Sequence, residues 1–142
     1  MVKRSNLALL AALGLAAGLS ACRRDVEAET HRPVENLTHV ASVAEFDKFV
    51  ASTPTPILVD LYADWCPPCR RLAPVLERLA PRYKGKVAFV KVNVGKVPAL
   101  ARRFGVRAIP TLLFLKKGRE ANRIVGAPPE AKLRSALDSL AR

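Results

Sequence analysis

Trp65-Cys66-Pro67-Pro68-Cys69 is the stretch that decides the fold of this 142-residue chain. Two cysteines separated by two residues can close a small ring and exchange one disulfide bond for another. The apolar run Pro56–Tyr62 before them is typical of a buried strand, and Arg70–Leu79 after them is typical of a helix. Cys66 is therefore expected where a helix begins, and backbone N–H groups at such a position favour the thiolate that disulfide exchange requires.

Length and composition indicate one domain with a core of its own, because 50% of the residues are hydrophobic. The 3 cysteines are too few for a disulfide-stapled scaffold. The formal net charge is +12. Because the basic residues are spread along the chain and aromatic residues make up only 6%, no platform for stacking nucleic acid bases is visible. A solvated basic surface is the simpler interpretation, and it would also attract anionic lipid headgroups.

The first residues have the pattern of an export signal. A basic start, Met1–Arg4, precedes the apolar run Leu7–Leu19, which is short for a bilayer span and typical of a signal peptide. Small residues then lead to Cys22, and this arrangement resembles the lipobox of bacterial lipoproteins. It implies a lipoprotein signal peptide over residues 1–21 and acylation of Cys22, with an ordinary secretory signal as the alternative. Either interpretation predicts an exported chain.

The segment after the signal is charged, contains one proline and lacks an apolar period. We expect residues 22–36 to form the lipidated cysteine and a flexible tether, and residues 37–142 to form the domain. The predicted location is a bacterial cell envelope, lipid-anchored and facing the periplasm or another extracytoplasmic space. A lipidated Cys22 would leave Cys66 and Cys69 as the thiols available for redox chemistry.

A structural metal site is not expected. A closed zinc site requires four ligands, whereas two thiols remain and His31 and His39 are distant from them in the sequence. A static buried disulfide is the other alternative to redox chemistry at Cys66 and Cys69.

Hydrophobic periodicity and turn residues predict an α/β domain with the order β-α-β-α-β-α-β-β-α. Alternation at the front implies parallel strands with helices on both faces, and a closing hairpin adds antiparallel strands. Ser42 and Glu45 form a capping-box pattern, Pro74 should kink the long helix, and Gly85 should end it. The expected strands are 37–41, 57–62, 87–92, 111–115 and 123–125. The expected helices are one after Ser42 with Val43, Phe46, Phe49 and Val50 on its apolar face, then 66–83, 98–104 and one that starts at Pro129.

Five landmarks in this order resemble thioredoxin: Val59-Asp60, Trp65–Cys69, Pro74, Ile109-Pro110-Thr111 and Gly126. The resemblance covers residues 37–141 and shows no insertion between strand and helix of the kind found in cytochrome-maturation and peroxidase relatives. It implies the thioredoxin fold, a central mixed sheet flanked by helices, and thiol–disulfide exchange without a cofactor.

The resemblance also implies roles for the residues around the cysteine pair. Cys66 would be the attacking thiolate, and Cys69, one turn deeper, the resolving thiol. Asp60 lies in an apolar strand, where burial raises a carboxyl pKa and suits it to take the proton of Cys69. Lys91, on the neighbouring strand, would pair with Asp60. The alternatives are a solvent-facing acid at position 60 and an ordinary surface lysine at position 91.

A substrate groove is implied beside the disulfide. Pro110 would follow a cis peptide bond and face the disulfide, and the main chain of Ile109 would pair with an extended substrate strand. Gly126 would keep the opposite lip of the groove clear, although an ordinary turn glycine is an alternative. Trp65 and Tyr62 would contribute partly to the active site and partly to packing.

The two prolines between the cysteines predict the direction of the reaction. Thioredoxin usually has glycine at the position of Pro67, and oxidants of this fold tend to carry histidine at the position of Pro68. Proline supplies neither an N–H nor a charge to the thiolate, so we predict a protein-disulfide reductase. The alternatives are a disulfide oxidase or isomerase, or a non-catalytic peptide-binding lipoprotein. The expected partners are disulfide-bearing envelope proteins and an integral-membrane electron donor, without nucleic acid, and the protein is expected to be a monomer.

Overall fold

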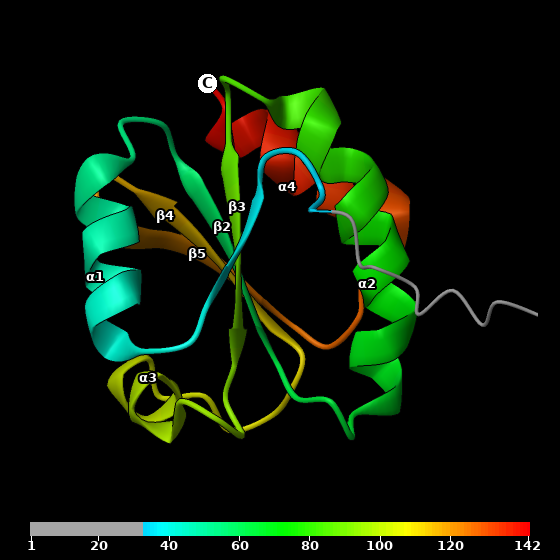
Figure 1. Cartoon of the computed structure of the whole chain (residues 1–142). Coiled ribbons are helices and arrows are strands. Elements are labelled where there is room, and N and C mark those ends of the chain that lie inside the picture. Colours follow the sequence, from blue (N-terminus) through cyan, green and yellow to red (C-terminus); the bar gives the residue numbers. More distant parts are fainter. Residues whose placement is uncertain (1–32) are drawn as a thin grey trace, which may run out of the picture. The chain divides into compact units, whose positions relative to one another are not determined.

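The computed structural model describes residues 33–142, so the expected signal peptide, Cys22 and most of the expected tether lie outside the described residues. The order of the elements agrees with the predicted one, apart from an added 3₁₀ helix, η1 (Figure 1). Among these residues, no helix is long and apolar enough to cross a membrane. The elements are β1 (Leu37–Val40), α1 (Val43–Ser52), β2 (Ile57–Tyr62), α2 (Pro67–Leu79), η1 (Ala80–Tyr83), β3 (Ala88–Asn93), α3 (Pro98–Arg103), β4 (Thr111–Lys116), β5 (Arg119–Val125) and α4 (Glu130–Leu140).

The strands form one mixed sheet in the spatial order β1-β3-β2-β4-β5. β1 and β2 run parallel to β3, whereas β4 runs antiparallel to both β2 and β5. The predicted parallel front and antiparallel hairpin are thereby confirmed. Since β1, β2 and β3 end at the edge of the sheet where β4 begins and β5 ends, the loops at these positions meet there. We call this edge the site edge.

Helices cover both faces of the sheet, with α2 and α4 on one face and α1 and α3 on the other (Figure 1). Successive side chains of a strand point to opposite faces. Leu58 and Phe89 accordingly pack in the core beneath α2 and α4, while Val59 and Val90 pack in the core beneath α1 and α3. Burial on both faces explains why the central strands are almost continuously apolar.

The helix after the cysteine pair is shorter than predicted. We expected one helix over residues 66–83, but α2 ends at Leu79 and the chain continues as the 3₁₀ helix η1. Pro81 explains the change, because proline has no N–H to donate to the carbonyl four residues earlier. Gly85, with a φ of 76°, follows as the expected stop.

Packing onto the domain begins before β1. The side chain of Val34 contacts the core, and the amide of Asn36 donates to the carbonyls of Ala80 (2.7 Å) and Val87 (2.9 Å). Lys84 forms an ion pair with Glu35. Residues 34–36, which we expected in the tether, are therefore held on the domain by side-chain contacts that the sequence did not reveal.

Candidate active site

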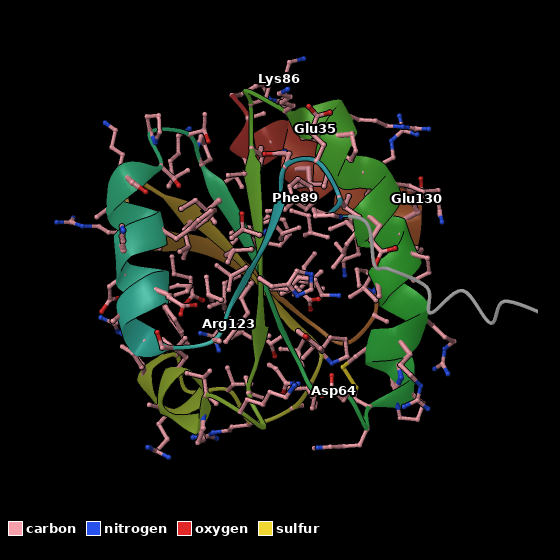
Figure 2. All side chains as sticks on the ribbon, viewed as in Figure 1. Glu35, Asp64, Lys86, Phe89, Arg123 and Glu130 are labelled. Carbon is pink, nitrogen blue, oxygen red and sulfur yellow. A yellow bond between two sulfur atoms is a disulfide. The ribbon has the colours of Figure 1, made fainter. Side chains whose placement is uncertain are left out.

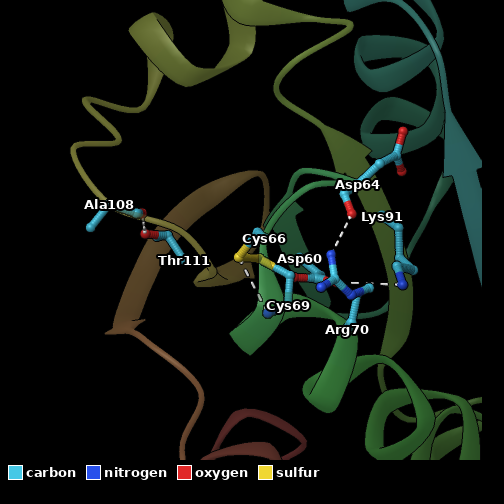
Figure 3. Close-up of a disulfide and its surroundings, with 8 residues drawn as sticks. All are labelled: Asp60, Asp64, Cys66, Cys69, Arg70, Lys91, Ala108 and Thr111. Atoms are coloured by element: carbon cyan, nitrogen blue, oxygen red, sulfur yellow. Dashed lines mark hydrogen bonds and ion pairs between the residues drawn. A yellow bond between two sulfur atoms is a disulfide. The ribbon is translucent and has the colours of Figure 1, made fainter.

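The cysteine pair lies at the site edge, where the loop after β2 enters α2. Cys66 and Cys69 form a disulfide with a Cα–Cα distance of 5.3 Å (Figures 2 and 3). Cys66 is the N-cap of α2, and its Sγ accepts a hydrogen bond from the N–H of Cys69 at 3.3 Å. In this oxidised state the residues are only 3% and 4% exposed, respectively, so Cys66 is more covered than its position at the end of the loop suggested.

The start of α2 offers few backbone N–H groups to the sulfur of Cys66. An N-cap side chain normally accepts from the N–H of the second or third helical residue. In α2 the first two helical residues are Pro67 and Pro68, which have no N–H, so Cys69 supplies the N–H that reaches Cys66. The lack of an N–H from either proline is what the sequence analysis predicted for these two positions.

Asp60 and Lys91 form a buried pair behind the disulfide (Figure 3). They lie opposite each other in the register of β2 and β3, and Lys91 Nζ is 3.8 Å from Asp60 Oδ2. The residues are 3% and 6% exposed, so neither the solvent-facing acid nor the surface lysine considered above is correct. Burial raises the pKa of Asp60 to about 6, although the positive charge of Lys91 lowers it.

The two oxygens of Asp60 are not equivalent. Oδ2 faces Lys91, whereas Oδ1 is buried without a hydrogen-bond partner in residues 33–142. Lys91 has a second neighbour, because its Nζ lies 4.6 Å from the ring centroid of Tyr62. A cation over an aromatic face is stabilised by the ring quadrupole. Tyr62 therefore helps to hold the ammonium that faces Asp60, while one carboxyl oxygen stays available for a proton.

The expected cis peptide bond is present between Ile109 and Pro110. Thr111 Oγ donates to the carbonyl of Ala108 at 2.7 Å and closes the turn around this bond (Figure 3). The N–H of Gly126 donates to the carbonyl of Pro110 at 2.7 Å, which joins the end of β5 to the same turn. The loops before β4 and after β5 are thus fixed to each other at the site edge.

Ile109 presents an open main chain beside the disulfide. Its side chain packs against the cluster formed by Ala63 and the two cysteines. Within residues 33–142, no hydrogen bond is formed by its backbone N–H or carbonyl. Gly126 has a φ of 88°, and a Cβ built there would meet nothing within 4 Å, so the opposite lip is open. Trp65, also at this edge, is 73% exposed.

The structure thus brings together all the predicted site residues of the domain, namely Asp60, Trp65, Cys66, Cys69, Lys91, Ile109, Pro110 and Gly126. Sequence reasoning expected Tyr62, like Trp65, to contribute partly to the site and partly to packing, but it foresaw neither its ring beneath Lys91 nor the bond of the Thr111 hydroxyl. The position of Thr111 directly after Pro110 was a usable signal, because threonine hydroxyls often bond to nearby main-chain groups in turns. In the described part of the chain, no group of three or more metal-ligating side chains could hold a metal ion.

A disulfide at a helix start, beside a main chain without partners, can exchange its bond with the thiols of a second chain that pairs there. This reactivity defines the protein as a thiol–disulfide oxidoreductase.

Comparison with known proteins supports the same class. The family model described as Thioredoxin matches residues 37–139. A thioredoxin of Synechocystis is 42% identical over 101 residues, which cover 71% of this chain and 94% of the relative. An M-type chloroplastic thioredoxin of Pisum sativum is 38% identical over 107 residues, which cover 75% of this chain and 62% of the relative. The X-ray structure of Fasciola hepatica thioredoxin superposes with a TM-score of 0.68 at 36% identity, covering 72% of this chain and 98% of that one. The chain belongs to the thioredoxin family.

Proposed function

We propose that this protein is a membrane-tethered, extracytoplasmic protein-disulfide reductase. The observation that carries the reaction is the arrangement at the site edge. Cys66 lies at the start of α2, Asp60 lies behind the pair with an unpaired oxygen, and Ile109 offers an open main chain. The leader and Cys22 in the sequence support the tether and the location.

The proposed reaction transfers two electrons and two protons to the substrate. The substrate strand lies along Ile109, and the Cys66 thiolate attacks one sulfur of the substrate disulfide, so that a mixed disulfide forms and the first substrate thiolate leaves and takes up a proton. Cys69 then gives its proton to Asp60 and attacks Cys66 Sγ. The Cys66–Cys69 disulfide forms, the second substrate sulfur leaves, and it takes up a proton.

The direction of the reaction follows from how weakly the thiolate is stabilised. A disulfide is a strong oxidant when its reduced form is stabilised. Here a single N–H reaches Cys66, and Pro68 adds no donor. We therefore expect a potential near about −270 mV in equilibrium with glutathione, and a value above roughly −180 mV would contradict a reductase.

Trapping of the mixed disulfide tests the reaction. Without Cys69 the second step stops, so Cys69→Ser should accumulate mixed disulfides through Cys66, visible as adducts on non-reducing gels of the native envelope. The matched control Cys66→Ser keeps the fold and removes the attacking sulfur, and it should form none. A peptide-binding module with idle cysteines would give no adducts with either variant, and this result would overturn the enzymatic proposal.

The tether has its own test. The parallel strands begin at the edge opposite the disulfide, and Asn36, just before β1, bonds there to the carbonyl of Val87. Figure 2 shows Glu35 at one end of the molecule and Asp64, two residues before Cys66, at the other. Cys22→Ser should move the protein from the membrane to the soluble fraction and leave its reduction of insulin unchanged. Retention in the membrane would contradict the lipid anchor.

The proposed partners follow from the location. The substrates would be disulfide-bearing proteins of the envelope, and an integral-membrane donor would supply electrons to the oxidised pair. We propose that the protein acts as a monomer.

A further inference from the structure

Three basic side chains lie on segments that meet at the site edge, near the disulfide. Arg70 lies on α2 directly after Cys69, Lys96 lies in the loop between β3 and α3, and Arg107 lies two residues before Ile109. All three are exposed. We call them the basic rim. They come from three different segments of the chain that the fold gathers at the site edge.

Contacts tie the rim to the active-site loop. Lys96 Nζ lies 3.6 Å from Asp64 Oδ2, and Arg70 Nη1 donates to the main-chain carbonyl of Asp64 at 3.0 Å (Figure 3). Gly95, next to Lys96, lies close to the indole of Trp65: a Cβ built on this glycine would be 3.9 Å from Trp65 Nε1. Lys96 and Arg70 are therefore positioned next to the residues that lead into Cys66.

Most of the positive charge of the basic rim is not neutralised by ion pairs. The Lys96 and Asp64 side chains are 72% and 66% exposed, and such ion pairs are weak in water. Arg70 contacts an uncharged carbonyl of Asp64, and Arg107 forms no ion pair within residues 33–142. Among the three cations of the rim, Lys96 alone is paired with a carboxylate of the described residues, that of Asp64.

We infer that this enzyme prefers disulfides whose flanking residues are acidic. The inference rests on the proposed function and names its substrate class. A substrate strand paired with Ile109 extends along the chain past Arg107. Residues 107–110 form a loop and bend, not a strand, and Arg107 lies beside this position because it is two residues before Ile109 in the chain. An aspartate or glutamate two residues from the substrate position opposite Ile109 comes within reach of the Arg107 guanidinium.

Charge complementarity of this kind acts on encounter and orientation more than on the chemical step. An arginine can also bind a carboxylate with two parallel hydrogen bonds, which fixes the direction of the substrate strand. Since exposed charges are screened over about 10 Å at 0.1 M salt and about 3 Å at 1 M, the preference must shrink as salt rises.

A competition between two peptide disulfides tests the inference. The peptides differ only in carrying Asp or Lys at the two positions on each side of the cysteine. With the full chain at low salt, kcat/KM should be about tenfold higher for the Asp peptide, mainly through KM, and the ratio should approach one at about 1 M NaCl.

Variants locate the effect. Arg107→Gln should lower the Asp-to-Lys ratio at least about threefold, and so should Arg70→Gln, because each removes one of the rim charges. Lys116→Gln, an exposed lysine at the far end of β4, is the matched control and should leave the ratio unchanged.

Equal kcat/KM for the two peptides at low salt would overturn the preference while leaving the reductase proposal intact. An Asp-to-Lys ratio of kcat/KM that stays unchanged in both arginine variants would mean that other residues cause the preference, and it would overturn the role of the basic rim. Inhibition by anionic vesicles without any peptide preference would make the rim a lipid-binding surface and likewise overturn the inference. Failure to reduce either peptide would remove the proposed function and this inference with it.

Discussion

Asp60 couples the proposed proton transfer to the stability of the fold. The pKa of its carboxyl group is about 6 in the folded protein, against 3.8 as the ordinary value. The folded state therefore binds this proton more tightly than the unfolded state does. The stabilisation associated with the proton is fully present below pH 3.8 and is lost as the pH rises through about 6. At neutral pH the ionised Asp60 opposes folding by roughly 3 kcal/mol.

Asp60→Asn should therefore stabilise the protein at pH 7 and slow the reaction. We expect the free energy of unfolding to rise by roughly 2–3 kcal/mol, because asparagine stays neutral in both states. The fall in stability of the parent between about pH 4 and pH 6 should disappear in the variant. Denaturant unfolding at several pH values measures both effects. Asp47→Asn, an exposed aspartate of α1, is the control, and it should keep the pH dependence of the parent.

The same variant should release reduced insulin more slowly at pH 7, because no carboxylate accepts the proton of Cys69. Unchanged turnover together with the gain in stability would remove the catalytic role of Asp60. The buried Asp60–Lys91 pair would then have only a structural function.

At the scale of the secondary-structure elements, the N-terminus of α2 sets how reducing the disulfide is. The first two helical positions are prolines, so the sulfur of Cys66 receives the N–H of Cys69 and no N–H from Pro67 or Pro68. Strand β2 and the turn at Ile109 lie beside the disulfide. Within residues 33–142, neither of them donates a hydrogen bond to the sulfur of Cys66.

Pro68→Ala should make the disulfide more oxidising. Alanine restores an N–H at the second helical position, where N-cap side chains accept hydrogen bonds. A hydrogen bond to a charged group contributes about 1.5–3 kcal/mol, so the potential should rise by roughly 30–60 mV and the pKa of Cys66 should fall. Equilibration with glutathione measures the potential. Pro74→Ala adds an N–H within the same helix but away from the sulfur, and it should leave the potential where it was. A more reducing Pro68→Ala would contradict this explanation.

The first helix depends on its N-cap in a way that does not involve the disulfide. Ser42 Oγ accepts from the N–H of Glu45 at 3.1 Å, and the Glu45 carboxylate accepts from the N–H of Ala41 at 2.8 Å. The capping box predicted from the sequence is therefore present, with the carboxylate bonding one residue earlier than in the ideal motif.

Ser42→Ala should lower the free energy of unfolding by about 1 kcal/mol and the melting temperature by roughly 4–8 °C, because the N–H of Glu45 in the first turn loses its partner. Thermal unfolding followed by circular dichroism measures this. Ser139→Ala, at an exposed serine of α4 whose hydroxyl bonds within its own helix, should change the melting temperature far less. Equal shifts in the two variants would mean that the cap contributes nothing specific.

On the scale of the whole molecule, the high net positive charge lowers the stability of the folded state. The net charge is +12, and the ion pairs at the surface, such as Arg78–Glu130 with exposures of 56% and 37%, are each weak. Self-repulsion of a highly charged chain destabilises its folded state, and salt screens that repulsion.

The melting temperature should therefore rise when NaCl is raised from about 10 mM to about 300 mM, over which the screening length falls from roughly 30 Å to below 10 Å. Differential scanning calorimetry measures the change. The double variant Lys116→Glu and Arg119→Glu lowers the net charge by four units at the β4–β5 turn, and its melting temperature should depend less on salt. A melting temperature that falls with NaCl would mean that attractive pairs outweigh the repulsion.

The sequence by itself determined the order of the elements, the cysteine pair at the start of a helix, the buried acid at position 60 and the landmarks of the thioredoxin family. These are local features, because periodicity, caps and turn residues act over a few neighbouring positions. The early end of α2 at Leu79, two residues before Pro81, also had a local cause.

Only the tertiary structure decided which groups meet across the chain. It placed the ammonium of Lys91 between Asp60 and the ring of Tyr62, left Asp60 Oδ1 and the main chain of Ile109 without partners, and bonded Gly126 to Pro110. It also brought the segments that carry Arg70, Lys96 and Arg107 together at the site edge. Contacts of this kind depend on strand register and loop placement between residues distant in sequence. These are set by the packing of the whole core, and no local pattern encodes them.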